Sequence, residues 1–290
     1  MQSADGLNHA WNTPPPAGPG ESARAFYRRV MQELAQAEVP VLVGGGFAFA
    51  EYTGIRRYTK DLDLFVRPSD AQWTLDTLAA AGYRAEMIAP HWLGKVYDEN
   101  ESFIDLIFSS GNGVAIVDDE WFEYAEPAEV LDMPVSLSPV EEMIWSKAFV
   151  LERERFDGAD VAHLIRARGN GLDWERMFRR FDPHWHVLLS HLMFFRFAYP
   201  SERAVVPRWV LRGLMGRLQH EMENDVPDRR LCQGTLLSSR QYLPDVELWG
   251  YQDARLEPDV HMTAADIALL TSSIRAQEAR DHDAKHRGHR

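Results

Sequence analysis

The chain has 290 residues, of which 45% are hydrophobic and 26% charged, a composition typical of globular proteins. Its longest uncharged stretch that resembles a membrane span, Val39–Ala50, has twelve residues and three glycines, too few to cross a hydrocarbon core of roughly 30 Å. The single cysteine, Cys232, excludes intrachain disulfides and metal sites built from cysteines. Residues 1–20 show no signal-peptide pattern, so we expect a cytoplasmic protein with no membrane association.

The formal net charge of −13 is distributed unevenly along the chain. Residues 1–137 contain nine Lys and Arg against 21 Asp and Glu, whereas residues 138–220 contain thirteen against ten. An acidic first half beside a mildly basic middle predicts two units that meet at a charged cleft. Non-specific affinity for nucleic acid comes mostly from Lys and Arg that neutralise phosphates. The composition therefore favours a cationic acceptor or divalent metal ions and argues against strong non-specific binding of nucleic acid.

The pattern of the first half predicts a flexible arm and then a mixed α/β unit. Pro- and Gly-rich residues 1–21 form the arm, and apolar spacing predicts a helix over 22–37. A β-branched run, Val39–Val43, predicts a buried strand that ends in Gly44–Gly46. Further along we expect a helix over 47–53, strands over 62–66, 83–88, 93–98, 102–108 and 114–117, and a helix over 73–81.

After residue 137 the apolar residues recur every three or four positions, which predicts helices. We expect these over 140–154, 158–168, 174–181, 186–197, 210–223 and 262–279, with a turn-rich stretch over 225–260. The predicted fold class is therefore α+β. A small mixed β-sheet domain with flanking helices spans 22–137, an all-α domain spans 138–280, and a disordered tail spans 281–290.

The glycines at the end of the first strand suggest an anion site. A buried strand runs into Gly44–Gly46 and a helix begins directly afterwards. This arrangement leaves backbone N–H groups and the positive end of a helix dipole open to an anion such as phosphate. Glycine suits these positions because a Cβ would hold the phosphate away from the backbone.

Three aspartates on predicted strands suggest a metal site. Asp61 and Asp63 are two residues apart, so both carboxylates point to one face of their strand, with Cα atoms about 7 Å apart. Asp105 is an isolated charge between Ile104 and Leu106 on another strand, and alternation directs it away from these apolar neighbours. Carboxylates this close repel one another unless cations lie between them. Mg²⁺ or Mn²⁺, held by carboxylates and substrate phosphates, is the expected partner.

The glycine turn and the three acids together predict a two-metal site for nucleotidyl transfer. Two ions about 3.5–4 Å apart stabilise the attacking oxygen and the leaving pyrophosphate of an in-line displacement. In this interpretation Asp61 and Asp63 bind both ions. Asp105 binds the ion nearer the acceptor and accepts the acceptor's proton.

The same residues resemble the signature of the nucleotidyltransferase superfamily, which has a polymerase-β-like fold. Gly45-Gly46-Phe-Ala matches its glycine pair, Asp61-Leu-Asp63 its Asp-x-Asp and Asp105 its third acid. The fourteen residues between Gly46 and Asp61, and the lead-in Arg57-Tyr-Thr59-Lys60, are similar to the branch of abortive-infection toxins of type IV toxin–antitoxin systems and their uncharacterised bacterial relatives. The resemblance covers roughly residues 22–168, and Gly46 departs from it because many active members have Ser there.

The resemblance also implies residues that contact the nucleotide. That branch places a Lys on the first helix after the catalytic domain and an Asp further on, which Lys147 and Asp157 or Asp160 match. Lys147 would contact the triphosphate, and the aspartates would support the site or the lysine. The residues of the lead-in to the metal-binding strand are expected to touch phosphate, with a solvated loop as the alternative. They are Arg57, Thr59 and Lys60.

The sequence thus predicts an enzyme that transfers a nucleoside monophosphate from an NTP to an acceptor. The acceptor stays open between a small cationic molecule such as an aminoglycoside, a tRNA end and a protein hydroxyl. The alternative is a non-catalytic regulatory or structural module that binds nucleotide and metal through a degenerate site. A dinucleotide-binding fold is disfavoured because Phe49 replaces the third glycine, and no P-loop motif occurs. His184, His186 and His191 are expected to be ordinary packing or surface residues.

Overall fold

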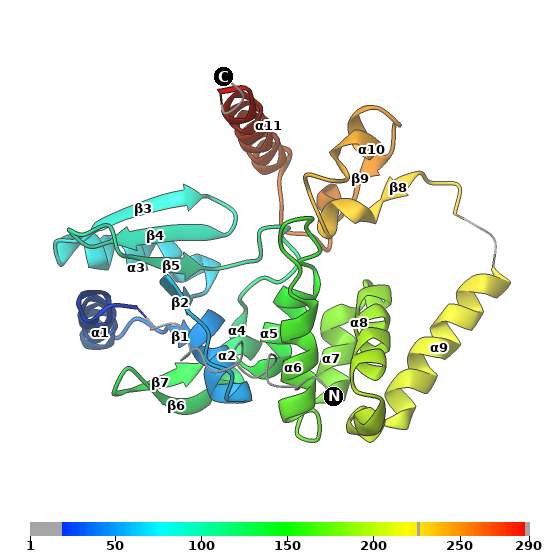
Figure 1. Ribbon diagram of the computed structural model, residues 1–290, viewed down its shortest axis with the longest axis horizontal. Helices are drawn as coiled ribbons and strands as arrows, with labels where there is room; N and C mark the ends of the chain where they lie inside the picture. Colours follow the sequence, from blue (N-terminus) through cyan, green and yellow to red (C-terminus); the bar gives the residue numbers. More distant parts are fainter. Residues whose placement is uncertain (1–18, 225–226, 288–290) are drawn as a thin grey trace, which may run out of the picture.

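The computed structural model describes residues 19–224 and 227–287, with side chains up to residue 280. Residues 1–18 of the expected arm and 288–290 of the expected tail lie outside the described residues. Figure 1 shows a β-sheet at one end of the molecule and a group of helices beside it. No helix in the described ranges is both long and apolar enough to cross a bilayer.

A seven-stranded mixed sheet forms the first half, which confirms the predicted fold class. Its strand order is β3-β4-β5-β2-β1-β7-β6. The pairs β2/β5 and β1/β7 are parallel and the other four are antiparallel. The strands are β1 (Leu42–Val43), β2 (Asp61–Phe65), β3 (Arg84–Ala89), β4 (Leu93–Tyr97), β5 (Phe103–Ile107), β6 (Glu126–Val130) and β7 (Met133–Leu137).

The two faces of the sheet have different roles. On one face the side chains are fully buried among those of α1 (Glu21–Gln36) and α3 (Pro68–Ala80), as Leu62 and Ile104 illustrate. Gly94 faces the same way, because a Cβ there would lie 3.1 Å from the side chain of Leu75 in α3. Strand alternation sends Asp61, Asp63 and Asp105 to the opposite face, which α3 does not cover.

Helices follow the sheet, and the first of them pack against its end. They are α5 (Val140–Ala148), α6 (Gly158–Arg168), α7 (Trp174–Phe181), α8 (Trp185–Ala198) and α9 (Arg208–Glu223). The helix that follows the glycine turn, α2 (Gly45–Thr53), packs on α6, while α4 (Asp119–Glu123) leads into β6. One hydrophobic core runs from the sheet through these helices. The expected boundaries at residues 137 and 280 stay predictions.

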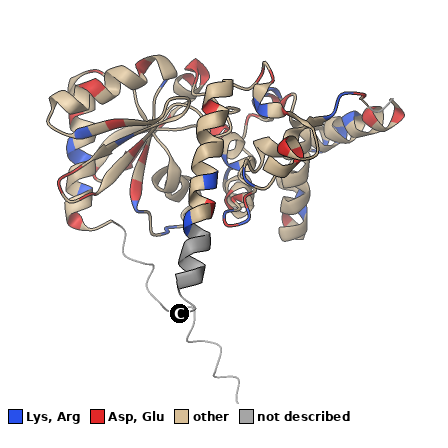
Figure 2. Cartoon of the chain, turned by 90° about the horizontal axis from the view of Figure 1, so that it is seen from above, with Lys and Arg blue, Asp and Glu red and all other residues tan. Residues whose placement is uncertain are grey.

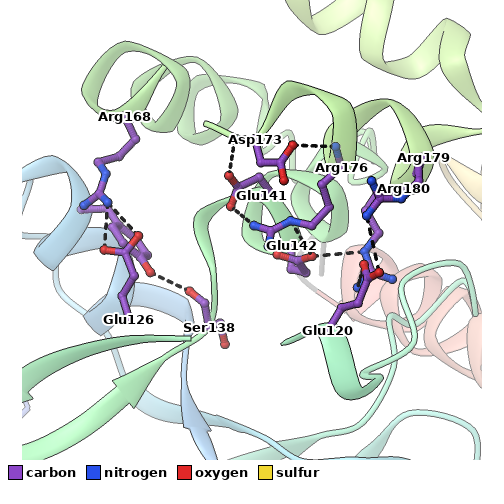
Figure 3. Close-up of polar contacts among 11 residues, drawn as sticks. Glu120, Glu126, Ser138, Glu141, Glu142, Arg168, Asp173, Arg176, Arg179 and Arg180 are labelled. Carbon is purple, nitrogen blue, oxygen red and sulfur yellow. Dashed lines mark hydrogen bonds and ion pairs between the residues drawn. The ribbon is translucent and has the colours of Figure 1, made fainter. Parts of the chain in front are cut away.

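Buried ion pairs join the helices α5 and α7 (Figure 3). Glu142 is completely buried on α5, and burial raises the pKa of its carboxyl although Arg176 and Arg180 of α7 oppose that rise. Glu141 accepts hydrogen bonds from the Arg176 guanidinium and from the backbone N–H of Asp173. These contacts fix α7 against α5.

The C-terminal segment returns to the sheet half. It contains β8 (Leu231–Cys232), α10 (Leu243–Glu247), β9 (Gln252–Asp253) and α11 (Ala264–Arg287), which projects from the rest of the chain in Figure 1. The side-chain amide of Asn112 donates to the carbonyl of Leu236 at 2.7 Å. The backbone N–H of His261 donates to the carbonyl of Gly113 at 2.9 Å. This segment thereby lies next to the loop that follows β5.

Several elements differ from their predicted extents. Residues 114–117 form no strand, and the hairpin β6–β7 was missed. Prolines in both of its strands argue against strands, and its turn at Leu131–Asp132, with φ of 55° and 61°, lacks the usual Asn or Gly. Helix α5 ends six residues early, because the N–H of Leu151 bonds the carbonyl of Leu237 instead of continuing the helix. Helix α11 continues to Arg287, where a tail was expected.

Both acidic and basic residues lie on the sheet and on the helices, as Figure 2 shows. The expectation of two units that meet at a charged cleft stays a prediction.

Candidate active site

The glycine turn and Asp63 are built around each other. Gly45, the first residue of α2, has φ of +52°, which favours glycine. A Cβ at this position would lie 1.6 Å from Oδ2 of Asp63. The N–H of Gly44 also donates to the backbone carbonyl of Asp63 at 2.9 Å. The absence of a side chain at residue 45 thus lets an acidic group approach the beginning of a helix. Gly46 packs on Thr59, because a Cβ built on Gly46 would lie 3.2 Å from the Cβ of Thr59.

The three predicted acids lie together on one face of the sheet. Asp63 and Asp105 are direct partners in the parallel pair β2/β5, and Asp61 precedes Asp63 by two residues. Burial, followed by the charges of Asp61 and Asp105, raises the pKa of Asp63 to about 7. Burial also raises the pKa of Asp105, although a hydrogen bond from Lys95 opposes that rise. In the described ranges no three His, Cys, Asp or Glu side chains converge as ligands of one metal ion.

Lys95 is a neighbour of Asp105 that the sequence interpretation missed. It is the direct partner of Asp105 in the antiparallel pair β4/β5, and its Nζ lies 2.5 Å from Oδ1 of that carboxylate. The ammonium also lies over the ring of Phe103, 3.9 Å from its centroid. The sequence feature that could have indicated this residue is its position as the single cation within the otherwise uncharged strand 93–97.

Lys147, Asp157 and Asp160 lie together, as the resemblance implied. The Lys147 ammonium donates to Asp157 at 3.1 Å and to Asp160 at 3.0 Å. Asp160 also accepts a hydrogen bond from Arg57. Burial alone would raise the pKa of Asp157, but hydrogen bonds from Arg155 and the charge of Lys147 outweigh it and the pKa is lowered.

Arg155 is a second cation that was not singled out. It lies in the loop between α5 and α6, and its guanidinium binds both carboxylate oxygens of Asp157, at 3.1 and 2.9 Å. The charges of Arg155 and Lys147 both act to lower the pKa of Asp63. The sequence does place this arginine two residues before Asp157. We did not expect the loop that carries it, because the predicted helix over 140–154 extended over most of that loop.

Thr59 and Lys60, which were expected to touch phosphate, have these contacts within the protein. The Thr59 hydroxyl donates to Oδ1 of Asp61 at 3.1 Å and so orients that carboxylate. The side chain of Lys60 is exposed, while its backbone carbonyl accepts a hydrogen bond from Tyr27 at 3.0 Å. Burial, followed by the charge of Asp61, raises the pKa of Tyr27 to about 12.

A cavity of about 1030 Å³ connects these groups with the C-terminal segment. Of the predicted residues it is lined by Gly45, Gly46, Asp61, Asp63, Asp105, Lys147 and Asp157, whereas Arg57, Thr59, Lys60 and Asp160 lie outside its lining. The lining includes seven carboxylates against four basic side chains. The lining also includes apolar side chains, among them Trp92, Leu236 and Leu270.

The three central histidines do not converge. His184 lies 3.2 Å from Asp259, His186 lies 2.6 Å from Glu221, and His191 lies 2.8 Å from the carbonyl of Ala148. Burial lowers the pKa of both His184 and His191. Each therefore has its own structural partner.

One family model matches residues 27–133, less than half of the chain, and is described as aminoglycoside-2''-adenylyltransferase. The matched segment contains Asp61, Asp63 and Asp105 but ends before Lys147. At the level of class the chain is therefore a nucleotidyltransferase. The abortive-infection branch is not confirmed by this match. A comparison with curated proteins gave no match.

Solved structures with partial similarity are themselves nucleotidyltransferases or resemble them. The lincosamide adenylyltransferase LnuA, lincomycin-bound, is 16% identical over 51% of this chain and 98% of its own, with a TM-score of 0.36. The antibiotic-resistance factor ANT(2'')-Ia is 15% identical over 70% of this chain and 97% of its own, with a TM-score of 0.39. A nucleotidyltransferase-like protein from Paracoccidioides brasiliensis is 12% identical over 65% and 94%, with a TM-score of 0.42. TM-scores this low carry no further conclusion.

Proposed function

We propose that this nucleotidyltransferase moves a nucleoside monophosphate from an NTP to a hydroxyl group of an acceptor, with Mg²⁺ or Mn²⁺ as the metal. The observation that carries the proposal is the placement of Asp61, Asp63 and Asp105 on one sheet face, beside the glycine turn and facing a cavity. A structural role does not account for this placement, because burial, followed by the charges of Asp61 and Asp105, raises the pKa of Asp63 and so disfavours its ionised form.

The triphosphate would lie between the glycine turn and the loop after α5. The N–H groups at the beginning of α2 can donate to phosphate oxygens, and the helix dipole favours negative charge there. Lys147 and Arg155 line the same cavity. Both are bound to carboxylates, which holds the two cations in place before a nucleotide arrives.

The residues present fit a divalent ion. Asp61 and Asp63 supply the oxygen ligands that Mg²⁺ and Mn²⁺ prefer. Burial, followed by the charges of Asp61 and Asp105, raises the pKa of Asp63, and a cation bound there would favour the ionised form. When bound, the ion would neutralise phosphate charge as the transition state forms. Thr59 would hold Asp61 in position through its hydroxyl.

In the transfer step one phosphorus–oxygen bond forms and another breaks. The acceptor oxygen forms a new bond to the α-phosphorus while the bond from that phosphorus to the bridging oxygen breaks, and pyrophosphate leaves with the electron pair. The proton of the acceptor hydroxyl passes to the carboxylate of Asp105, whose raised pKa suits a group that accepts a proton. Lys147 and Arg155 would stabilise the charge of the leaving pyrophosphate.

For the acceptor we favour a small cationic polyol of the aminoglycoside type, with ATP as the donor. The excess of carboxylates along the cavity supports a cation, and the description of the matched family supports both the acceptor and the adenylyl group. A tRNA end and a protein hydroxyl are the alternatives. Binding of tRNA would weaken steeply with salt, whereas a flat salt profile would count against it.

Labelled NTPs, offered one at a time with Mg²⁺ and each acceptor class, test the proposal. We expect label on an acceptor together with released pyrophosphate. Asp61→Ala and Asp63→Ala should each reduce transfer by about 10³-fold or more, which is on the order of 4 kcal/mol. Asp76→Ala is the matched control, because Asp76 lies on α3 and bonds only to Gln72. Full transfer in both site variants would refute the assignment. Nucleotide binding without transfer to any acceptor would instead favour the regulatory module.

A further inference from the structure

Three charged side chains form a row across neighbouring strands. In register, Asp63 on β2 faces Asp105 on β5, and Asp105 faces Lys95 on β4. Direct partners on neighbouring strands project to the same face of a sheet. Lys95 is therefore part of the active-site face, on the side of Asp105 that is farther from Asp63.

Lys95 is held in this position by two contacts. Its ammonium lies 2.5 Å from Oδ1 of Asp105 and 3.9 Å from the centroid of Phe103. The pair is largely protected from water, since the side chains of Lys95 and Asp105 are 21% and 17% exposed. The register also brings Glu86 of β3 opposite Lys95, but Glu86 lies 3.9 Å from Arg84. Asp105 is thus the carboxylate that Lys95 neutralises.

A third carboxylate already paired with an ammonium is a poor ligand for a second divalent ion. Two carboxylates with triphosphate oxygens suffice to hold a single Mg²⁺. The site therefore has two carboxylates for one ion, and its third carboxylate is already paired with a fixed positive charge.

We propose that Lys95 replaces the second metal ion of the site, so that the enzyme works with one divalent ion held by Asp61, Asp63 and the nucleotide. Asp105, oriented by Lys95, then serves the acceptor and is not a metal ligand. This inference rests on the proposed function and differs from our sequence-based expectation of two ions. Lys95 acts through Asp105 and is a positioning residue.

The test is to count Mn²⁺ ions in the wild-type chain. Free Mn²⁺ is measured by electron paramagnetic resonance during a titration at a saturating concentration of a non-hydrolysable ATP analogue. One ion per nucleotide-bound chain is expected, while two ions per chain overturn the inference. The count needs no variant and no turnover.

Three variants then assign the effect to Lys95. Lys95→Met removes the ammonium at similar side-chain length, and the count should rise from one ion to two. Lys95→Arg keeps a cation and should keep the count at one. Arg84→Met is the matched control, because it removes a neighbouring cation of the same sheet face that contacts Glu86 and Glu101. A count of one in a folded Lys95→Met variant, verified by its thermal unfolding, contradicts the role of Lys95.

The two proposals fail in different ways. A wild-type chain that binds nucleotide with two Mn²⁺ ions leaves the nucleotidyltransferase site intact and overturns only the role of Lys95. A wild-type chain that binds neither nucleotide nor Mn²⁺ contradicts the proposed function, and the inference falls with it.

Discussion

Two clusters of acidic residues, one on the sheet and one at the interface between α5 and α7, use carboxylates in opposite ways. At the interface Glu141 and Glu142 face Arg176 and Arg180, so that carboxylates and guanidinium groups are matched (Figure 3). On the sheet Asp61, Asp63 and Asp105 face one another, and Lys95 pairs with only one of them.

The difference separates a structural cluster from a binding site. Burial of charge is tolerated when each charge has its partner within the protein. A cluster that leaves negative charge uncompensated lowers stability, and such a cost is characteristic of functional sites. We therefore assign a structural role to the interface cluster and a binding role to the sheet cluster. Separate substitutions test each of the two assignments.

The largest expected effect is on the interface. Arg176→Met leaves Glu141 and Glu142 buried without their shared cation, and we expect the free energy of unfolding to fall by about 3–5 kcal/mol. Arg179→Met is the matched control, because Arg179 lies on the same helix with its side chain 58% exposed, and its removal should cost less than about 1 kcal/mol. Chemical denaturation measures both. An Arg176→Met variant as stable as the control would remove the structural role of this cluster.

The next effect is on the site and leaves the interface untouched. Gly45→Ala places a methyl group where Oδ2 of Asp63 lies, and the displaced carboxylate should reduce transfer by about 10²-fold. Gly54→Ala is the control, because Gly54 also has a positive φ, +72°, but open space around a Cβ. It should cost roughly 1–2 kcal/mol of stability and leave transfer unchanged. Equal transfer rates for the two variants would show that the contact with Asp63 is unimportant.

The effect that is smallest for each unit of change is a pH dependence of stability, which is spread over about three pH units. Because the pKa of Asp63 is about 7 in the folded chain and 3.8 otherwise, its protonated form stabilises the folded state below about pH 4. That contribution is lost as the pH rises towards 7, at no more than about 1.4 kcal/mol per pH unit. Asp63→Asn, which cannot ionise, should gain stability relative to the wild type over this range in metal-free buffer. Parallel unfolding curves of the two proteins from pH 4 to 8 would contradict the raised pKa.

The sequence predicted those parts of the fold and site that depend on local patterns. Alternation over 61–66 and 102–108 placed Asp61, Asp63 and Asp105 on one face, and the glycines marked the turn above them. The hairpin β6–β7 was missed because its prolines and its turn residues carry the opposite local signal. Whether the predicted site residues act as expected stays open to the experiments above.

What the sequence could not predict depends on contacts between distant segments. Lys95 meets Asp105 through strand register, which no local pattern specifies. Arg155 enters the cavity because a backbone bond between Leu151 and Leu237 ends α5 early. The cavity wall from the C-terminal segment likewise depends on the bond from Asn112 to Leu236. In each case tertiary contacts override or extend the local preference.

The most direct test of the central claim is calorimetric titration of the wild type and Asp63→Asn with Mg²⁺ and a non-hydrolysable ATP analogue at pH 8. We predict that the wild type binds the metal–nucleotide complex, whereas a stably folded Asp63→Asn variant binds it at least about tenfold more weakly, a difference of about 1.4 kcal/mol. Equal affinities in the two proteins would contradict the view that this acidic row is the site of nucleotide and metal binding.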